Sequence, residues 1–326
     1  ITMTSHHWLL AWIGLELNTL AIIPIIAKQH HPRGTEATTK YFLTQAAASA
    51  TLLFSSTINA WTMGTWDIAQ LTHQPACTLL TLALLMKLGL APLHFWLPEV
   101  LQGSSLKTAL IITTWQKLAP LALLYLTYNS LNPLILLTMG LLSTVIGGWG
   151  GLNQTQTRKI MAYSSIAHLG WMTTILALSP NIMLLNLTLY LIMTLSTFTV
   201  LIMTSSKTIK DLTTMWTISP TTSAFTLILL MSLAGLPPLT GFMPKWLILQ
   251  ELTTHNLTML ATGMALSALL SLFFYLRLSY MTTLTLSPTT TQSKLKWRLT
   301  PKQKTTILST TLILSTLLLP TTPALF

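Results

Sequence analysis

Six ionisable side chains lie inside long apolar segments of this sequence: Glu16, Lys87, Lys117, His168, Lys245 and Arg277. A charge in hydrocarbon is costly, so an ionisable residue at that depth is expected to have a partner and a function. A lysine in a low dielectric can take up and release protons, because burial disfavours its charged form. We therefore interpret Lys87 and Lys117 as members of a proton relay.

Depth supports this interpretation. Lys87 lies about 16 Å from either end of its apolar segment at 1.5 Å per residue, which is too far for its side chain to reach the headgroups. Lys117 is equally central. The alternative is a structural lysine held by an acid or a helix carbonyl. Glu16 is the one acid central enough to pair with either, and we predict that it faces Lys87 and modulates its affinity for protons.

Three further residues admit two interpretations each. Lys245 lies near one end of its apolar segment by linear count, so it is either a relay residue or an anchor that reaches the headgroups. Arg277 is expected to be an interfacial anchor, because arginine hardly ever deprotonates. His168 lies near the middle of its segment and titrates in the range that proton transfer needs, although a histidine that only packs is an equal alternative.

A ten-residue motif occurs twice: GLAPLHFWLP at 89–98 and GLPPLTGFMP at 235–244 share the pattern G-L-x-P-L-x-x-x-x-P. Proline removes a backbone donor from a helix, and irregular backbone is tolerated at membrane depth only where it lines protein or water. Paired Gly/Pro interruptions in two halves of a membrane protein indicate a transporter site built on broken helices. The residues predicted to break the two helices are Gly89, Pro92, Gly235, Pro237 and Pro238.

The composition is that of a bilayer protein: of 326 residues, 51% are hydrophobic and only 7% are charged. A span needs about 20 apolar residues, and ten segments qualify. They are roughly 7–27, 38–63, 76–101, 106–127, 131–151, 157–178, 182–204, 220–249, 257–284 and 303–320. The predicted fold is an all-α, polytopic membrane helix bundle.

The basic residues test this list of spans. Four of the 17 Lys and Arg residues lie inside spans, and the other thirteen follow the odd-numbered spans alone, as the positive-inside rule requires. These thirteen are Lys28, Arg33, Lys40, Lys107, Arg158, Lys159, Lys207, Lys210, Lys294, Lys296, Arg298, Lys302 and Lys304. Topology and attraction to anionic lipid explain the net charge of +11, so no nucleic-acid partner is expected.

The two motifs fall in the third and eighth predicted spans, five crossings apart. An odd number of crossings inverts the second copy, which is the inverted-repeat arrangement of many transporters. We therefore predict one transmembrane domain over residues 1–326. Its first half-repeat covers roughly 1–127, its second 131–285, and a loop with a C-terminal helix covers 286–326.

Redox and metal chemistry have no support in the sequence. Cys77 is the single cysteine, which allows neither a CxxC pair nor a thiolate iron–sulfur cluster. The adjacent pairs His6–His7 and His30–His31 lack the i,i+3 or i,i+4 spacing of helical metal ligands. We expect no cofactor, metal or nucleotide site in this chain.

With these residues in view, the chain closely resembles the chain 2 family of mitochondrial NADH:ubiquinone oxidoreductase, the antiporter-like membrane subunits of respiratory complex I. The resemblance runs nearly end to end. It rests on residues 7–16 (HWLLAWIGLE), 40–45 (KYFLTQ), 86–96 (MKLGLAPLHFW), 114–120 (TWQKLAP), 147–155, 158–168 (RKIMAYSSIAH) and 235–246 (GLPPLTGFMPKW). It implies that Glu16 and Lys87 are a coupled pair, that Lys117 is the central lysine and that Lys245 belongs to the second broken helix.

The resemblance also implies an activity and a location. A subunit of this family is expected to translocate protons across the mitochondrial inner membrane while electrons pass from NADH to ubiquinone elsewhere in the complex. Its partners would be other membrane-arm subunits, phospholipids with cardiolipin as a candidate, protons and water. The alternatives are an autonomous cation/proton antiporter and a structural scaffold subunit. Because the sequence begins at Ile1 without the family's first apolar helix, we expect about eleven spans in a full-length chain.

Overall fold

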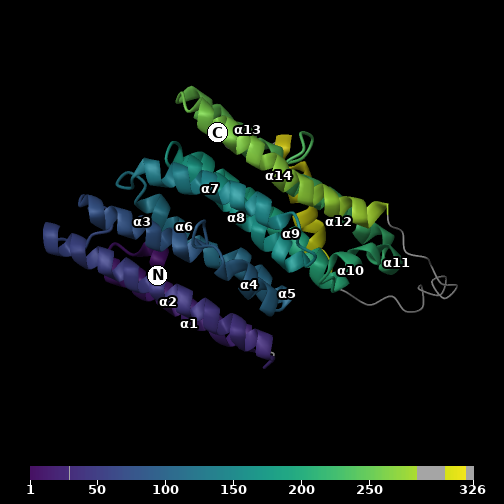
Figure 1. Ribbon diagram of the computed structural model, residues 1–326, viewed down its shortest axis with the longest axis horizontal. Helices are drawn as coiled ribbons and strands as arrows, with labels where there is room; N and C mark the ends of the chain where they lie inside the picture. Colours follow the sequence, from purple (N-terminus) through teal and green to yellow (C-terminus); the bar gives the residue numbers. More distant parts are fainter. Residues whose placement is uncertain (29, 285–304, 321–326) are drawn as a thin grey trace.

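The computed structural model describes residues 1–28, 30–284 and 305–320 (Figure 1). Its helices are α1 (Trp8–Ala27), α2 (Pro32–Met63), α3 (Gln74–Leu88), α4 (Trp96–Gly103), α5 (Leu106–Thr113), α6 (Trp115–Leu126), α7 (Pro133–Gly151), α8 (Thr157–Leu176), α9 (Pro180–Thr204), α10 (Ile209–Thr213), α11 (Met215–Ile218), α12 (Pro220–Ala234), α13 (Phe242–Thr254), α14 (Thr258–Thr283) and α15 (Thr306–Leu317). In the described ranges, β-type pairing is limited to two isolated bridges.

The helices follow the predicted spans closely. Five stretches are long and apolar enough to cross a membrane by themselves: α1, Leu106–Leu126, α7, α9 and α14. The third and eighth predicted spans are each divided into two helices, α3 with α4 and α12 with α13. The predicted span 106–127 is also divided, because α5 ends and α6 begins around Thr114. The predicted loop 286–302, with most of its basic residues, lies outside the described residues.

Serine and threonine are frequent in these helices because their hydroxyls bond to the helix that carries them. The Thr19 hydroxyl donates to the carbonyl of Glu16 at 2.8 Å, and Ser55 donates to Leu52 at 2.7 Å. Such back-bonding satisfies the hydroxyl without water. A helix rich in threonine can therefore stand in an apolar environment.

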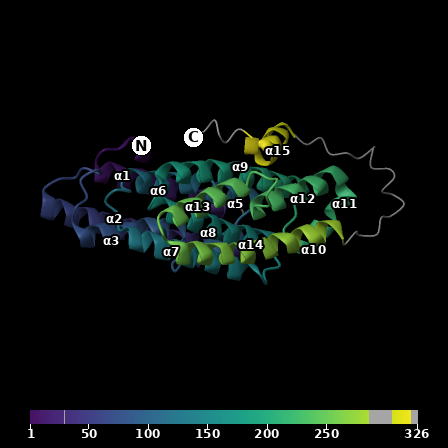
Figure 2. The same cartoon turned by 90° about the horizontal axis from the view of Figure 1, so that it is seen from above.

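The helices lie side by side in successive groups along the molecule (Figures 1 and 2). α1 and α2 form one edge, α7, α8 and α9 lie centrally, and α12, α13 and α14 lie at the other side, with α15 against α9 and α12. Glycines allow α7 and α8 to approach closely. A Cβ on Gly147 would lie 2.7 Å from the amide nitrogen of Ala167, and one on Gly170 would lie 2.7 Å from the carbonyl of Gly140.

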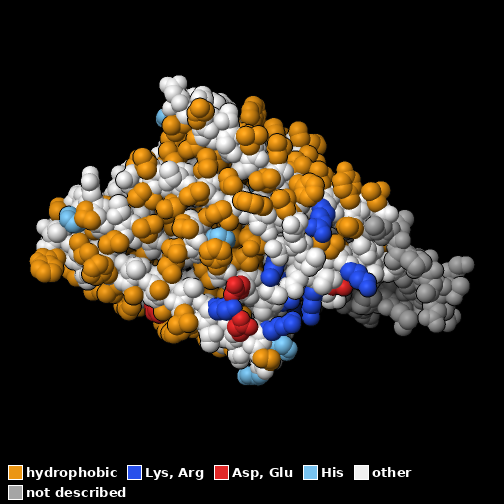
Figure 3. Space-filling model, in the orientation of Figure 1, with side chains coloured by type: hydrophobic (Ala, Val, Ile, Leu, Met, Phe, Trp, Pro, Cys, Tyr) orange, Lys and Arg blue, Asp and Glu red, His pale blue; other side chains and the backbone are white. Residues whose placement is uncertain are grey.

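Contacts between loops place the basic residues at one end of the bundle, as the charge pattern predicts. Gly103, at the end of α4, packs against the carbonyl of Arg33 at the start of α2. The Arg158 guanidinium donates to the carbonyl of Ser104, which joins the first turn of α8 to the loop after α4. Figure 3 shows Lys, Arg and acidic side chains gathered in one region of a face that is otherwise largely hydrophobic. We call this end the basic end.

The two Gly/Pro motifs coincide with the two helix breaks. α3 ends at Leu88 and α12 at Ala234, and each is followed by a glycine in the left-handed region, Gly89 with φ +78° and Gly235 with φ +79°. Glycine adopts this conformation without the strain that a Cβ would bring. The backbone resumes as α4 at Trp96 and as α13 at Phe242.

Candidate functional site

Lys87 lies in the last turn of α3, directly before the first break, and is only 6% exposed. Within the described part of the chain, its Nζ is buried and has no hydrogen-bond partner. A cavity of about 10 Å³ adjoins it, lined among others by Gln45, Trp96 and Gln116. This volume is close to what one water molecule needs, and the cavity is bordered by the amide side chains of Gln45 and Gln116 as well as by apolar groups.

Glu16 and Lys87 are not joined directly in the described part of the chain. No ion pair joins the two side chains in the ranges that the structure describes, and Glu16 Oε2 is also buried without a hydrogen-bond partner there. The predicted modulation of Lys87 by Glu16 therefore stays a prediction, and it would act without a direct ion pair.

A cluster of amide and phenol groups lies between α1, α2 and α6. Asn18 and Gln116 exchange two hydrogen bonds, each 3.1 Å long. The Tyr41 hydroxyl donates to Gln116 Oε1 at 3.3 Å, and Gln45 Nε2 donates to the carbonyl of Lys87 at 3.4 Å. The cluster connects the first break to the residue that precedes Lys117.

Lys117 lies in the first turn of α6 and is 2% exposed. Its Nζ donates to the hydroxyl of Tyr190 at 3.2 Å and lies 5.2 Å from the centre of that ring. The Tyr190 hydroxyl donates in turn to the carbonyl of Thr113 at 3.2 Å. A phenol can accept one proton while it gives another, so Tyr190 extends the reach of the lysine toward α9.

His168 lies on α8, beyond Tyr190. Its ring centre is 5.4 Å from that of Tyr190. The side chain is buried, with 7% exposed. His168 thus adjoins the tyrosine that Lys117 contacts, and both a packing role and a proton-transfer role fit this position.

Lys245 lies in α13 but turns back to the second break. Its Nζ donates to the carbonyl of Ala234, the last residue of α12, at 2.7 Å. A Cβ on Gly235 would lie 3.1 Å from the same amine. The broken helix therefore brings the amine to its interruption, although linear counting places Lys245 near the end of a span.

Arg277, on α14, forms a hydrogen bond to the end of α7 at the basic end. Its Nη1 donates at 2.7 Å to the carbonyl of Leu152, just after α7. A cation at a helix C-terminus bonds unpaired carbonyls and interacts favourably with the helix dipole. This geometry suits a structural role for Arg277.

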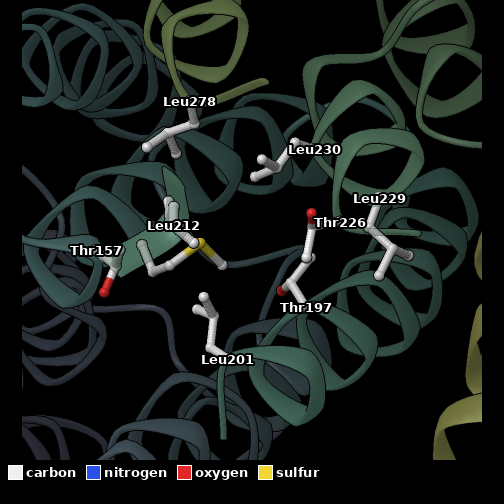
Figure 4. Close-up of a pocket in the computed structure, with 9 residues that line it drawn as sticks. Thr157, Thr197, Leu201, Leu212, Thr226, Leu229, Leu230 and Leu278 are labelled. Atoms are coloured by element: carbon white, nitrogen blue, oxygen red, sulfur yellow. The ribbon is translucent and has the colours of Figure 1, made fainter. Parts of the chain in front are cut away.

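A second cavity has the opposite chemistry. About 20 Å³ lies between α8, α9, α10, α12 and α14 (Figure 4), and its lining is mostly leucine. The hydroxyls of Thr197 and Thr226 that border it donate to the backbone of their own helices. With its polar groups satisfied in this way, the cavity offers no bonding site to a proton carrier.

Sequence reasoning missed Tyr190, Tyr41 and Asn18 as neighbours of the buried charges. Gln116 could have been found, because it directly precedes Lys117 in the polar run TWQK. The tyrosines could not, since they reach the site from helices that the sequence does not place beside it. In the described ranges, no group of three or more His, Cys, Asp or Glu residues could hold a metal ion.

Comparison with known proteins decides the family. A family profile described as NADH:quinone oxidoreductase/Mrp antiporter, TM, matches residues 5–273, and one described as NADH dehydrogenase subunit 2 C-terminus matches residues 272–326. NADH-ubiquinone oxidoreductase chain 2 of Xenopus laevis is 62% identical over 323 residues, covering 99% of this chain and 94% of the relative. The chain belongs to the NADH-ubiquinone oxidoreductase chain 2 family. The same chain of Salmo salar is 61% identical over 325 residues, covering 100% of this chain and 93% of the relative.

Solved structures agree with this family and its polytopic helical fold. A chain of respiratory complex I from Thermus thermophilus superposes with a TM-score of 0.81 at 28% identity, covering 98% of this chain and 76% of that one. A chain of the Mrp complex from Dietzia sp. superposes with a TM-score of 0.78 at 18% identity, covering 88% and 59%. At that identity the second likeness concerns the fold alone. The resemblance found in the sequence is thus confirmed.

Proposed function

We propose that this chain is the antiporter-like membrane-arm subunit of a proton-pumping NADH:ubiquinone oxidoreductase in the mitochondrial inner membrane. Relatives that match it over nearly their whole length are named as chain 2 of that enzyme, and the description of the matching family also mentions Mrp antiporters. Its partners would be the other membrane-arm subunits and the surrounding phospholipids, with cardiolipin as a candidate.

Protons would pass along a row of buried groups. The row comprises Glu16, Lys87, Lys117 and Lys245, with His168 as a further member. The observation that carries the proposal is the contact of Lys117 with Tyr190, whose ring adjoins His168. Amines, a phenol and an imidazole in this order can exchange protons through hydrogen bonds and intervening water, and none of them needs to exchange an electron.

The energy for this movement would come from outside the chain. Moving one charge against the membrane potential costs about 2.3 kcal/mol per 100 mV, and this subunit is proposed to hold no redox centre. Charge shifts arriving from neighbouring subunits would change the proton affinity of Glu16 first and then of Lys87. The inverted half-repeats, roughly 1–127 and 131–285, would each contribute one broken helix to the path.

The test is the number of protons pumped per NADH oxidised by the assembled complex, in a genetically tractable counterpart that carries Lys117→Leu. Assembly is checked first on a native gel. A lower ratio, or suppressed NADH oxidation in an intact complex, is expected because the central amine is gone. Unchanged turnover and ratio would mean that the buried lysines only hold helices together.

A second measurement separates the autonomous antiporter. The purified chain is placed in liposomes with a pH gradient and no NADH. We expect no cation flux above that of empty liposomes, because the energy enters through neighbouring subunits. Flux driven by pH alone would overturn the coupled mechanism.

A further inference from the structure

The loop of the second break is bonded to α15. Thr240 lies in that loop, between the end of α12 and the start of α13, and is only 1% exposed. Its hydroxyl donates to the carbonyl of Ser315, in the last turn of α15. Ser315 is also 1% exposed. The bond therefore joins two buried residues that lie 75 positions apart in the sequence.

Most hydroxyls of the described helices bond within their own helix, and Thr240 differs from them. Thr226 and Ser232 on α12, for example, donate to carbonyls three residues earlier. A carbonyl in the last turn of a helix lacks the N–H groups of a following turn and needs a partner from outside. The Thr240 hydroxyl therefore caps α15 and attaches the break to it at the same time.

α15 has few buried residues through which it can be held. It lies on the outer side of the bundle, against α9 and α12 (Figure 2). Of its twelve residues, Leu308 and Ser315 are the buried ones, whereas Ile313 and Leu317 are 56% and 68% exposed. A helix of this length is marginal by itself and depends on tertiary contacts. The bond at Ser315 is therefore one of the main contacts that determine where α15 lies.

On its other side, Thr240 leads to the lysine of the second break. The Thr240 carbonyl accepts a hydrogen bond of 3.3 Å from the N–H of Met243, in the first turn of α13. Lys245 follows on the same helix, and its amine returns to the carbonyl of Ala234. Thr240 thus connects α15 to the turn that leads into Lys245.

The first motif shows that a helix break does not require such a bond. Thr240 is the sixth residue of its motif, and the sixth residue of the first motif is His94. The Nδ1 atom of His94 lies 3.2 Å from the carbonyl oxygen of Pro92, within its own loop. Because the helix is interrupted in both copies, the bond to α15 serves something other than the interruption.

We propose that Thr240 is a positioning residue for Lys245. By bonding to α15, it fixes the loop of the second break, so that the amine of Lys245 stays at the carbonyl of Ala234. The hydroxyl itself transfers no proton. Without this bond, the first turn of α13 would shift relative to α12, and the amine would leave its carbonyl for part of the time. This inference rests on the proposed relay through Lys245.

The test is Thr240→Val in the assembled complex, because valine keeps the shape of threonine and removes the donor. The number of protons pumped per NADH should fall, but by no more than in Lys245→Met. Hydrogen exchange at the Met243 amide should accelerate about fivefold, since one buried hydrogen bond is worth about that factor in an opening equilibrium. Thr240→Ser should restore both values, because it restores the donor. Thr240→Ala replaces Thr240→Val if the latter does not assemble.

A double variant separates positioning from a merely structural role. In a complex that carries Lys245→Met, adding Thr240→Val should lower the pumped ratio no further, because no amine is left to position. Leu308→Ala should lower the ratio in the same way as Thr240→Val, since it loosens α15 at a residue outside the break. A further fall in the double variant, or an unchanged ratio in Leu308→Ala, would overturn the inference.

Thr226→Val is the matched control, because it removes a buried hydroxyl that bonds only within α12. We expect its pumped ratio to stay unchanged, and a loss equal to that in Thr240→Val would refute the positioning role. The relay and the inference fail in different ways. If Lys245→Met itself leaves the ratio unchanged, the relay fails and the inference with it. If Thr240→Val alone leaves it unchanged, only the inference fails.

Discussion

The two helix breaks share a sequence motif and a backbone geometry, yet they treat their lysines in opposite ways. In both, the glycine N–H and the following leucine N–H return to one carbonyl, that of Leu85 in the first break and Met231 in the second. In the first, Trp96 caps the neighbouring carbonyl of Met86, and the amine of Lys87 has no hydrogen-bond partner among the described residues. In the second, Lys245 itself caps Ala234.

The difference arises from residues that the motif does not specify. At the offset of 146 residues, Trp96 corresponds to Phe242, whose side chain has no N–H to donate, and Phe95 corresponds to Gly241. Glu99 in the first copy stands where Lys245 stands in the second. The motif thus breaks the helix, and its neighbours decide whether the lysine is bound at the break or free beside it.

The largest effect is expected at Gly241. A Cβ there would lie 1.8 Å from the carbonyl of Ser232, which is backbone and cannot move aside. Gly241→Ala should therefore destabilise the subunit by about 3 kcal/mol, the upper range for overpacking. The measurement is the midpoint temperature for loss of the assembled membrane arm on a native gel.

The matching position in the first break supplies the control for that prediction. Phe95 is 69% exposed, so Phe95→Ala should change stability by no more than about 0.5 kcal/mol. Equal losses at Gly241 and Phe95 would show that the second break is no more tightly packed than the first.

Replacing each lysine with methionine should change the stability of the complex in different directions at the two breaks. Lys245→Met leaves the buried carbonyl of Ala234 without its donor, which costs about 1–3 kcal/mol. Lys87→Met removes a buried amine that has no hydrogen-bond partner in the described chain, so stability should stay unchanged or rise. The measurement is thermal denaturation of the two assembled variant complexes. Equal losses of stability in Lys87→Met and Lys245→Met would contradict the difference between the two breaks.

A smaller effect is expected at the indole cap of the first break. Trp96→Phe removes the hydrogen bond to Met86 and should cost about 1 kcal/mol. Trp246→Phe provides the comparison, because that indole is on a side chain 58% exposed. Thermal midpoints of the two variants should differ, and identical midpoints would mean that Trp96 contributes only its ring.

The smallest effect is expected outside the membrane, where water can replace a lost cap. Asp211 accepts from the backbone N–H groups of Lys207 and Thr208 in a capping box. Slight burial opposes the effect, but these bonds hold the pKa of Asp211 below its usual value. Asp211→Asn should loosen this loop by about 0.5 kcal/mol at neutral pH.

The pH dependence of that loop follows from the sign of the shift. A carboxyl with a lowered folded pKa contributes stability that is present above its unfolded pKa of about 3.9 and is lost as pH falls through the folded value. The protection factors of the loop amides in hydrogen exchange should therefore fall at acidic pH in the unsubstituted chain but not in Asp211→Asn. The same pH dependence in both proteins would contradict the capping role of Asp211.

Much of the fold was readable from the sequence because each feature is local. Apolar length defined the spans, alternation of Lys and Arg defined the end at which loops meet, and Gly89 and Gly235 marked the breaks. The interruption at Thr114 was missed, because the stretch from Leu106 to Leu126 lacks glycine and its one proline, Pro120, lies six residues after Thr114.

The buried charged residues of the site could be predicted from the sequence, but the residues that contact them could not. Glu16, Lys87 and Lys117 stand out because hydrocarbon makes any ionisable residue conspicuous. Tyr190 and Trp96 do not, since aromatic residues are common in apolar helices and only packing brings them to an amine. The division into half-repeats stays a prediction.

The bond from Lys245 to the end of α12 has an electrical consequence. The C-terminus of a helix carries roughly half a negative charge, made of carbonyl dipoles. It can serve as a counter-ion to an ammonium group, but unlike a carboxylate it cannot accept the proton. A proton that leaves Lys245 therefore cannot bind to the α12 carbonyls that stabilised the ammonium group, and must pass to another acceptor.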